Sequence, residues 1–197
     1  MAELDKYDVI YCDPPWSFRD KMGKKGQGFA HSLSNHYPTM SIEDLKNLNV
    51  KSIAAKNSWC FMWVTSGNLK EGIQVMESWG FKYKTIAFVW MKKSPTGKQL
   101  YLMSKSSTMA ACEICIVGKR GRPKKYSNTV KQDINAPRGK HSAKPHETYD
   151  RIEELVGPDA KKIELFARNT KEGWHSLGND LDGRDIREIL GVVNGSV

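Results

Sequence analysis

Short apolar runs alternate with amphipathic segments along most of this 197-residue chain. Strand-like runs cover 7–12, 58–64, 82–91, 109–117, 162–166 and 174–177, and helical spacing marks 42–55, 68–79, 146–156 and 184–190. Alternation of this kind is typical of a mostly parallel sheet with helices on both faces. The pattern therefore predicts an α/β fold. No repeat or linker interrupts it, so we expect one domain over 1–197.

The first predicted strand runs directly into Asp13-Pro14-Pro15-Trp16. Ligands of open α/β sheets bind beyond the carboxyl ends of the strands. A carboxylate and a neighbouring carbonyl can accept both hydrogens of an exocyclic amine and so point its lone pair at an incoming methyl group. The prolines fix φ and donate no N–H, and Trp16 offers a π face for a base or a sulfonium. The alternative is an ordinary turn with a core tryptophan behind it.

The charge of the chain points to a polyanionic partner. The net charge is +9 and the isoelectric point is near 9.3, values often found in proteins that bind nucleic acid. A cytosolic protein that is simply basic is the alternative. No apolar run is long enough to span a bilayer, and the N-terminus lacks the features of a signal peptide. We therefore expect an intracellular, cytoplasmic protein with no membrane partner.

The four cysteines lie within or beside apolar runs and are interpreted as small core residues of a reducing compartment. Cys112 and Cys115 have the CxxC spacing, but their surroundings resemble a strand. Residues three apart on a strand point to opposite faces, and no second CxxC pair or paired histidines follow. We therefore expect no metal site.

Two long polar segments, 17–40 and 118–145, carry clusters of basic residues. Part of the second, Lys119-Arg120-Gly121-Arg122-Pro123-Lys124-Lys125, resembles the AT-hook, which lays Arg-Gly-Arg-Pro into the minor groove of A·T-rich DNA. A basic loop that contacts phosphates without reading sequence is the alternative. The candidates for backbone contacts are Lys21, Lys24, Lys25, Lys119, Arg120, Arg122, Lys124 and Lys125.

Several short motifs, in this order, resemble the DPPW-type adenine N-6 methyltransferases of the MT-A70 family. The resemblance runs from about Tyr7 to Gly183. Besides the tetrapeptide, it rests on Tyr37-Pro38-Thr39-Met40, Met62-Trp63-Val64-Thr65, Gly118-Lys119-Arg120-Gly121, His141-Ser142-Ala143-Lys144-Pro145, Lys162-Ile163-Glu164-Leu165-Phe166-Ala167-Arg168 and Leu177-Gly178-Asn179.

This resemblance implies a Rossmann-like, S-adenosylmethionine-dependent methyltransferase fold with permuted motifs, in which the catalytic motif precedes the cofactor strand. It places Asp13 between the donor's methionine end and the target amine. Lys144 would contact the donor, while Arg168 and Asn179 would hold its ribose and adenine. Tyr37 would stack on the target base.

Further candidates and three departures complete the comparison with the family. Trp16 and Trp63 join Tyr37 as candidates for holding an extruded base. Asp180 stands where the messenger-RNA enzyme has an amide, although an acid can still bind ribose hydroxyls. The segment after Arg168 is shorter than in that enzyme, and only twelve residues precede the tetrapeptide.

The sequence thus predicts transfer of a methyl group from S-adenosylmethionine to N-6 of adenine in DNA, with Asp13, Pro14, Pro15 and Trp16 as the catalytic motif. Two alternatives remain open. One is the same reaction on RNA. The other is a catalytically silent, nucleic-acid-binding subunit of a methyltransferase complex. Family members occur as monomers, homodimers and heterodimers, so the sequence leaves the assembly undecided.

Overall fold

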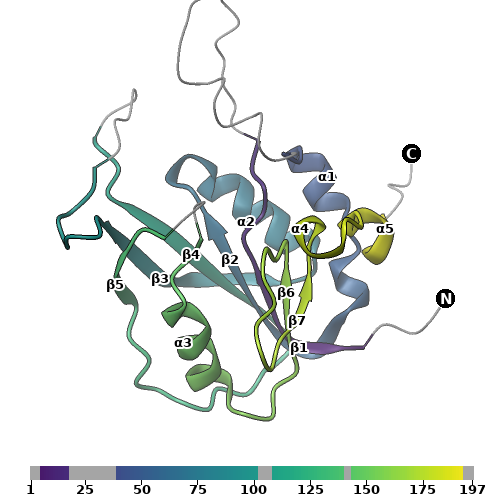
Figure 1. Ribbon diagram of the computed structural model, residues 1–197. Coiled ribbons are helices and arrows are strands. Elements are labelled where there is room, and N and C mark those ends of the chain that lie inside the picture. Colours follow the sequence, from purple (N-terminus) through teal and green to yellow (C-terminus); the bar gives the residue numbers. More distant parts are fainter. Residues whose placement is uncertain (1–4, 18–38, 102–107, 140–142, 193–197) are drawn as a thin grey trace, which may run out of the picture.

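The structure is a computed structural model that describes residues 5–17, 39–101, 108–139 and 143–192. Its helices and strands are shown in Figure 1. The strands are β1 (Tyr7–Cys12), β2 (Ala54–Val64), β3 (Lys82–Lys93), β4 (Cys112–Arg120), β5 (Asp133–Pro137), β6 (Lys162–Leu165) and β7 (His175–Leu177). The α-helices are α1 (Ile42–Asn47), α2 (Leu69–Ser78), α3 (Glu147–Val156), α4 (Asn179–Asp182) and α5 (Ile186–Leu190).

These strands form a seven-stranded sheet in the order β5-β3-β4-β2-β1-β6-β7. All neighbouring pairs are parallel except those made by β4, which runs antiparallel to both β2 and β3. The predicted mostly parallel sheet is confirmed. The reversed strand has a consequence for function, because it brings its first residues to the edge where the other strands end.

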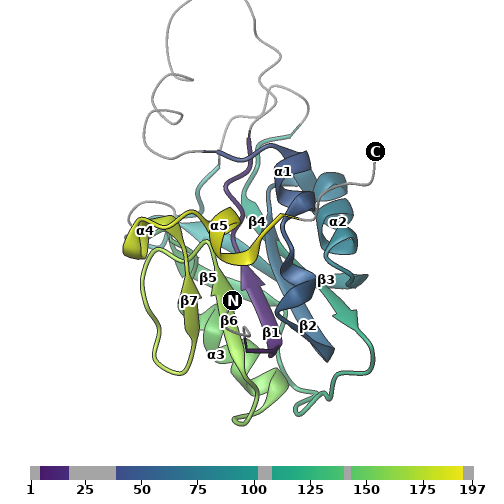
Figure 2. The ribbon, with the colours of Figure 1, turned by 90° about the vertical axis from the view of Figure 1, so that its right-hand side faces the viewer.

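Helices cover both faces of the sheet, as predicted (Figures 1 and 2). One core joins the sheet to α1, α2 and α5 through side chains such as Leu45, Met76 and Ile186. The other core lies on the opposite face, where Ile152 of α3 packs with Trp63, Trp90 and other residues. Within the described residues, no helix is both long and apolar enough to cross a bilayer.

Two of the predicted elements are wrong. The helix expected over 42–55 ends at Asn47, and after a 3-10 turn at Val50–Ser52 the chain enters β2 at Ala54. Pairing of Ala54 with Tyr7 of β1 outweighs the helical spacing there. The segment 118–145, expected to be a loop, contains the edge strand β5, whose last residue is Pro137. A strand that is short, polar and ends in proline is hard to recognise.

The carboxyl ends of β1, β6 and β7 lie side by side. Cys12 is in register with Leu165, and Leu165 with Leu177. The residues that follow these three strands therefore meet at one edge of the sheet, here called the carboxyl edge. The first strand of the chain thus neighbours strands from its last third, which is the permuted order that the resemblance implies.

Gly178 is required where β7 ends because another part of the chain comes very close to it. A Cβ atom at this position would lie 2.1 Å from the carbonyl oxygen of Ala167. The backbone of Gly178 is extended, with φ at 179°, so space rather than backbone freedom demands glycine.

We predict that Gly178→Ala lowers the free energy of unfolding by about 1–3 kcal/mol, as overpacking does in cores, and that urea denaturation measures the loss. Gly67→Ala is the matched control, since a Cβ at Gly67 meets nothing within 4 Å. Equal stability of the two variants would show that the chain at Gly178 relaxes freely.

Candidate active site

An ion pair joins the end of β1 to the segment that leads into α3. The Lys144 ammonium donates a hydrogen bond to Oδ2 of Asp13 over 2.6 Å. These side chains are 12% and 29% exposed, so the pair is largely withdrawn from water. Two residues far apart in the sequence, both predicted from motifs, therefore come into direct contact.

A second carboxylate shares the same lysine. Glu113, near the start of β4, lies 3.1 Å from the Lys144 ammonium and also pairs with Lys92 of β3. Sequence reasoning missed Glu113 and Lys92 as site residues. An acid inside an otherwise apolar strand was the available signal, but only the reversed direction of β4 places it at the carboxyl edge.

Burial and neighbouring charges shift the pKa values of Asp13, Glu113 and Lys144. Burial raises the pKa of Asp13 above its ordinary value, since Lys144 and Arg168 offset burial only in part and Glu113 adds a like charge. Burial alone would also raise the pKa of Glu113, but Lys144 and Lys92 hold it below its ordinary value. Burial would lower the pKa of Lys144, yet the two carboxylates hold it above the usual range. Lys144 is therefore a charged ammonium at neutral pH.

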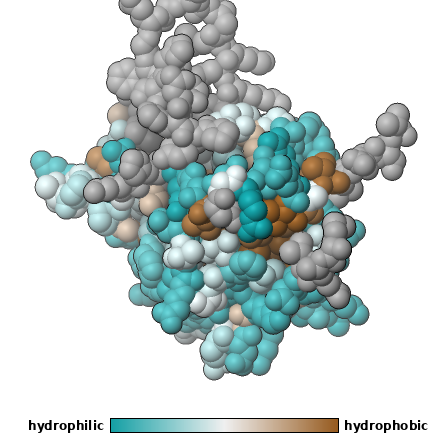
Figure 3. Space-filling view, turned by 45° about the vertical axis from the view of Figure 1, so that its right-hand side comes forward, coloured by the Kyte–Doolittle hydropathy of each residue, from teal (hydrophilic) through white to brown (hydrophobic). Residues whose placement is uncertain are grey.

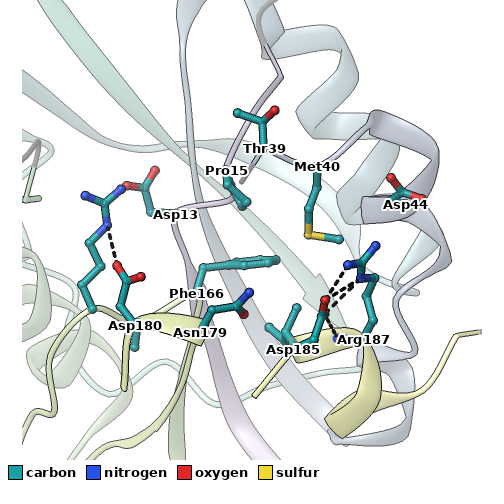
Figure 4. A pocket seen from close by; sticks show the side chains of 13 residues that line it. Asp13, Pro15, Thr39, Met40, Asp44, Phe166, Asn179, Asp180, Asp185 and Arg187 are labelled. Atoms are coloured by element: carbon teal, nitrogen blue, oxygen red, sulfur yellow. Dashed lines mark hydrogen bonds and ion pairs between the residues drawn. The ribbon is translucent and has the colours of Figure 1, made fainter. Parts of the chain in front are cut away.

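Four of the predicted cofactor residues line one cavity of about 200 Å³ next to this ion pair. They are Asp13, Arg168, Asn179 and Asp180. Figure 4 shows the Phe166 ring across the middle of this cavity, with Asp13 and Asp180 toward one end and Asp185 and Arg187 at the other. The acidic, amide and guanidinium groups are of the kinds that bind ribose hydroxyls and an adenine ring.

The donor set therefore fits S-adenosylmethionine. The Nε atom of Arg168, which follows β6, lies 4.0 Å from Oδ2 of Asp180, which follows β7, and both residues line the cavity. Lys144 extends the set beyond Asp13 with a cation that suits a carboxylate. Phe166 adopts a φ of 63°, and such backbone conformations in residues other than glycine cluster at functional sites.

Trp16 and Trp63 are structural parts of this edge. Trp16 is 6% exposed and donates its ring N–H to the carbonyl of Trp63 over 3.0 Å. Trp63 is 1% exposed, and the Lys144 ammonium lies 5.7 Å from the centre of its ring. Neither ring presents the open face that a stacked base needs.

The tetrapeptide's carbonyls are partly occupied. The Pro14 oxygen accepts the backbone N–H of Trp16 over 2.8 Å, and the Pro15 oxygen accepts that of Met40 over 2.9 Å. The prolines donate no backbone N–H, but the N–H groups of Trp16 and Met40 occupy part of each acceptor. A carbonyl oxygen has two lone pairs, so Pro14 keeps one for an amine.

A partly buried hydrogen bond links the beginning of α3 to the sheet. The Tyr149 hydroxyl donates to Oε2 of Glu164, on β6, over 2.8 Å. Burial raises the pKa of Glu164 to about 7; the hydrogen bond lowers it and the charge of Asp13 raises it further. Tyr149 lies five residues beyond Lys144, so this contact holds the chain that follows Lys144 against the sheet.

The basic candidates of the second polar segment lie away from this site. Lys119 and Arg120 end β4, and Arg120 pairs with Ser58 near the start of β2. They therefore lie at the opposite edge of the sheet from Asp13, here called the amino edge. Nη1 of the Arg120 guanidinium also donates to the carbonyls of Lys51 and Ala54, so this side chain helps to hold the end of β4 to the start of β2. Its contact with phosphates stays a prediction.

Some candidates have no described position. Tyr37, Lys21, Lys24 and Lys25 lie outside the described residues. In the part of the chain that is described, no three His, Cys, Asp or Glu side chains are grouped as ligands of a metal ion. Cys12, Cys60 and Cys115 are buried free thiols, and Cys112 is half-buried.

Glu164 gives the site a predicted pH signature. Its pKa is about 7 in the folded protein against an ordinary 4.5, so between these values the folded state holds a proton that the unfolded chain releases. Stability from this group is therefore complete below about pH 4.5 and is lost as the pH rises through 7. As the pH rises from 4.5 to 8, we predict that the free energy of unfolding of Glu164→Gln increases by up to about 3 kcal/mol relative to that of the unsubstituted protein. Urea denaturation of both proteins across this range tests it, and parallel curves would contradict it.

Comparison with known proteins gives the family. The sequence model of the MT-A70 family matches residues 7–180. The chain is 36% identical over 195 residues to the type II methyltransferase M.MunI of Mycoplasma sp, an alignment covering 92% of this chain and 80% of that protein. It is 32% identical to an N(6)-adenosine-methyltransferase MT-A70-like protein of Arabidopsis thaliana, covering 96% of this chain and 26% of that protein.

The human N(6)-adenosine-methyltransferase catalytic subunit METTL3 is 27% identical, over 93% of this chain and 30% of its own length. The chain thus spans less than a third of each of these two adenosine methyltransferases. These matches confirm the resemblance that the motifs indicated, together with the methyltransferase fold and the methyl donor that it implies. The chain belongs to the MT-A70 family of adenine N-6 methyltransferases, whose methyl donor is S-adenosylmethionine.

Proposed function

We propose that this chain methylates N-6 of adenine in DNA and that 1–197 acts as one methyltransferase domain. The observation that carries the proposal is the contact between Asp13 and Lys144 beside a cavity lined by Arg168, Asn179 and Asp180. When bound, S-adenosylmethionine supplies an electrophilic methyl group on a sulfonium. The remaining chemistry is positioning, which such a site can supply without a metal.

Asp13 and the Pro14 carbonyl would accept the two hydrogens of the adenine amine. Asp13 must be ionised to do so, and Lys144, at 2.6 Å, favours its ionised form. Lys144 would hold the donor's carboxylate, with Glu113 and Lys92 fixing its position. Arg168, Asn179 and Asp180 would hold the ribose and adenine of the donor.

The target base needs a stacking partner other than the two buried tryptophans. We assign this role to Tyr37, as the resemblance implies. Trp16 instead braces the tetrapeptide through its bond to the Trp63 carbonyl, and Trp63 supports Lys144. An extruded base would thus meet Asp13 at the carboxyl edge.

The similarity to M.MunI favours DNA, because type II methyltransferases are DNA-modifying enzymes, and this alignment covers most of both chains. The adenosine methyltransferases support RNA as the second candidate, but the chain spans only 26–30% of those proteins. A silent subunit is disfavoured because the tetrapeptide, Lys144 and Arg168 are all present and converge. Methylation assays on duplex DNA, single-stranded DNA and RNA of one sequence separate the candidates.

We predict that Asp13→Asn lowers kcat by about 100-fold or more, the size of effect seen when one group that orients or stabilises the reacting centre is removed. Labelled methyl transfer to an adenine-containing duplex measures it. Asp159→Asn, which alters an exposed carboxylate, is the matched control and retains full activity. Wild-type turnover by Asp13→Asn would refute the proposed role of Asp13.

We predict that Lys144→Met raises the Kd for S-adenosylmethionine about 10-fold to 100-fold, the range expected for a hydrogen bond between charged groups. Isothermal titration calorimetry measures it, with Lys131→Met, an exposed lysine elsewhere, as the control. If both variants bind the donor with unchanged affinity, Lys144 does not hold its carboxylate.

A further inference from the structure

Six basic side chains gather at the amino edge of the sheet, far from the candidate active site. All six are exposed. They come from the turn before β2, the starts of β2 and β3, and the chain that follows β4. We call this set the amino-edge cluster: Lys51, Lys56, Lys82, Arg122, Lys124 and Lys125.

Backbone contacts hold these residues together. Lys82 is in register with Lys119 of β4, and the side chain of Lys51 lies within 4 Å of where a Cβ on Gly80 would be. The backbone N–H of Arg122 donates to the side-chain oxygen of Asn57 over 2.8 Å. The ring N–H of Trp59 donates to the Lys124 carbonyl over 3.1 Å. The basic side chains therefore extend from a backbone with a defined position.

None of the six pairs with a carboxylate anywhere in the part of the chain that the structure describes. Lys124 instead lies 5.9 Å from the centre of the Tyr126 ring. Like charges held close together repel one another, so a bound polyanion would relieve this repulsion.

The cluster does not have the form of an AT-hook. Both arginines of that element must reach the minor groove, but the Arg120 guanidinium is bonded to the Lys51 and Ala54 carbonyls. Gly121 turns the chain with a φ of 61°, and a Cβ there would lie 2.4 Å from the Lys56 carbonyl oxygen. The folded, anchored segment fits phosphate contact from a surface rather than insertion into a groove.

A protein partner fits this surface less well than a polyanion does. Protein–protein interfaces are depleted in lysine at their centres, and five of the six residues are lysines. Figure 3 shows mainly hydrophilic residues at the lower end of the molecule, where β1 begins in Figure 1. Beside the cluster, Tyr126 follows Lys125 and is an exposed large hydrophobic residue, at 63%.

We propose that the amino-edge cluster binds the phosphates of duplex DNA at a second site, separate from the site that holds the target base. The proposal rests on the DNA substrate proposed above. Glu113 and Arg120 lie seven residues apart on β4, which corresponds to about 24 Å of strand. That separation equals about 7 base pairs of DNA. A duplex that contacts both edges must therefore be considerably longer than the few base pairs around the target.

The test compares a 30-bp duplex with a hairpin whose 8-bp stem carries the same adenine at its centre, so that the stem extends from the adenine by less than the separation of the two edges. The variant is Arg122→Gln/Lys124→Gln/Lys125→Gln. Lys131→Gln/Lys161→Gln/Lys171→Gln, with the same charge loss outside the cluster, is the control. Fluorescence anisotropy at several salt concentrations gives the Kd values, and an unchanged Kd for S-adenosylmethionine shows that each variant is folded.

We expect the unsubstituted protein to bind the 30-bp duplex more tightly than the hairpin, and the cluster variant to lose most of this gain. For the cluster variant, the plot of log K against log salt becomes less steep by up to about 3, since each phosphate contact contributes about 0.9 to the steepness. The control variant retains both the gain and most of the slope.

Unchanged binding of the 30-bp duplex by the cluster variant would overturn the proposal and identify the surface as simply solvated. Equal losses in both triple variants would also overturn it, because net charge alone would then explain the effect. Cluster-dependent DNA binding by a protein that methylates neither substrate would support this inference and refute the proposed function instead.

Discussion

The organisation of the site depends on one ammonium group shared by two carboxylates. Lys144 contacts Asp13 at 2.6 Å and Glu113 at 3.1 Å, and these contacts join the ends of strands that are distant in the sequence. Removing one partner from such a withdrawn group leaves an uncompensated charge, which is costly. The same lysine lies over the ring of Trp63. The backbone carbonyl of Trp63 accepts a hydrogen bond from the ring N–H of Trp16. Charge balance and the geometry of the tetrapeptide are thus connected.

The topology of the sheet makes this meeting possible. Parallel strands β1, β6 and β7 deliver Asp13, Arg168 and Asn179 to the carboxyl edge. The antiparallel strand β4 begins at that edge, where it carries Glu113, and ends at the other edge with Arg120. The start of this one strand therefore supplies a carboxylate to the site. Its end places the basic residues that follow β4 at the amino edge.

Much of this arrangement could be predicted from the sequence. Apolar runs and helical spacing gave the sheet and its layers, and the motifs gave Asp13, Lys144 and Arg168. The direction of β4 could not be predicted, because the sequence of a strand does not show whether its neighbours run parallel or antiparallel to it. Glu113 was therefore missed as a site residue. The sequence places Arg120 among the candidates for phosphate contact, but it does not show that the Arg120 guanidinium donates to nearby carbonyls. The burial of Trp16 was likewise set by packing rather than by its motif.

We propose that the Asp13 carboxylate orients the amine that receives the methyl group, while Lys144 holds the carboxylate of the donor. A crystal structure with S-adenosylhomocysteine and an oligonucleotide carrying the target adenine measures this directly. We expect N-6 to lie within hydrogen-bond distance of both Asp13 and the Pro14 carbonyl, with Lys144 on the carboxylate of S-adenosylhomocysteine. An adenine amine that contacts neither acceptor would contradict it.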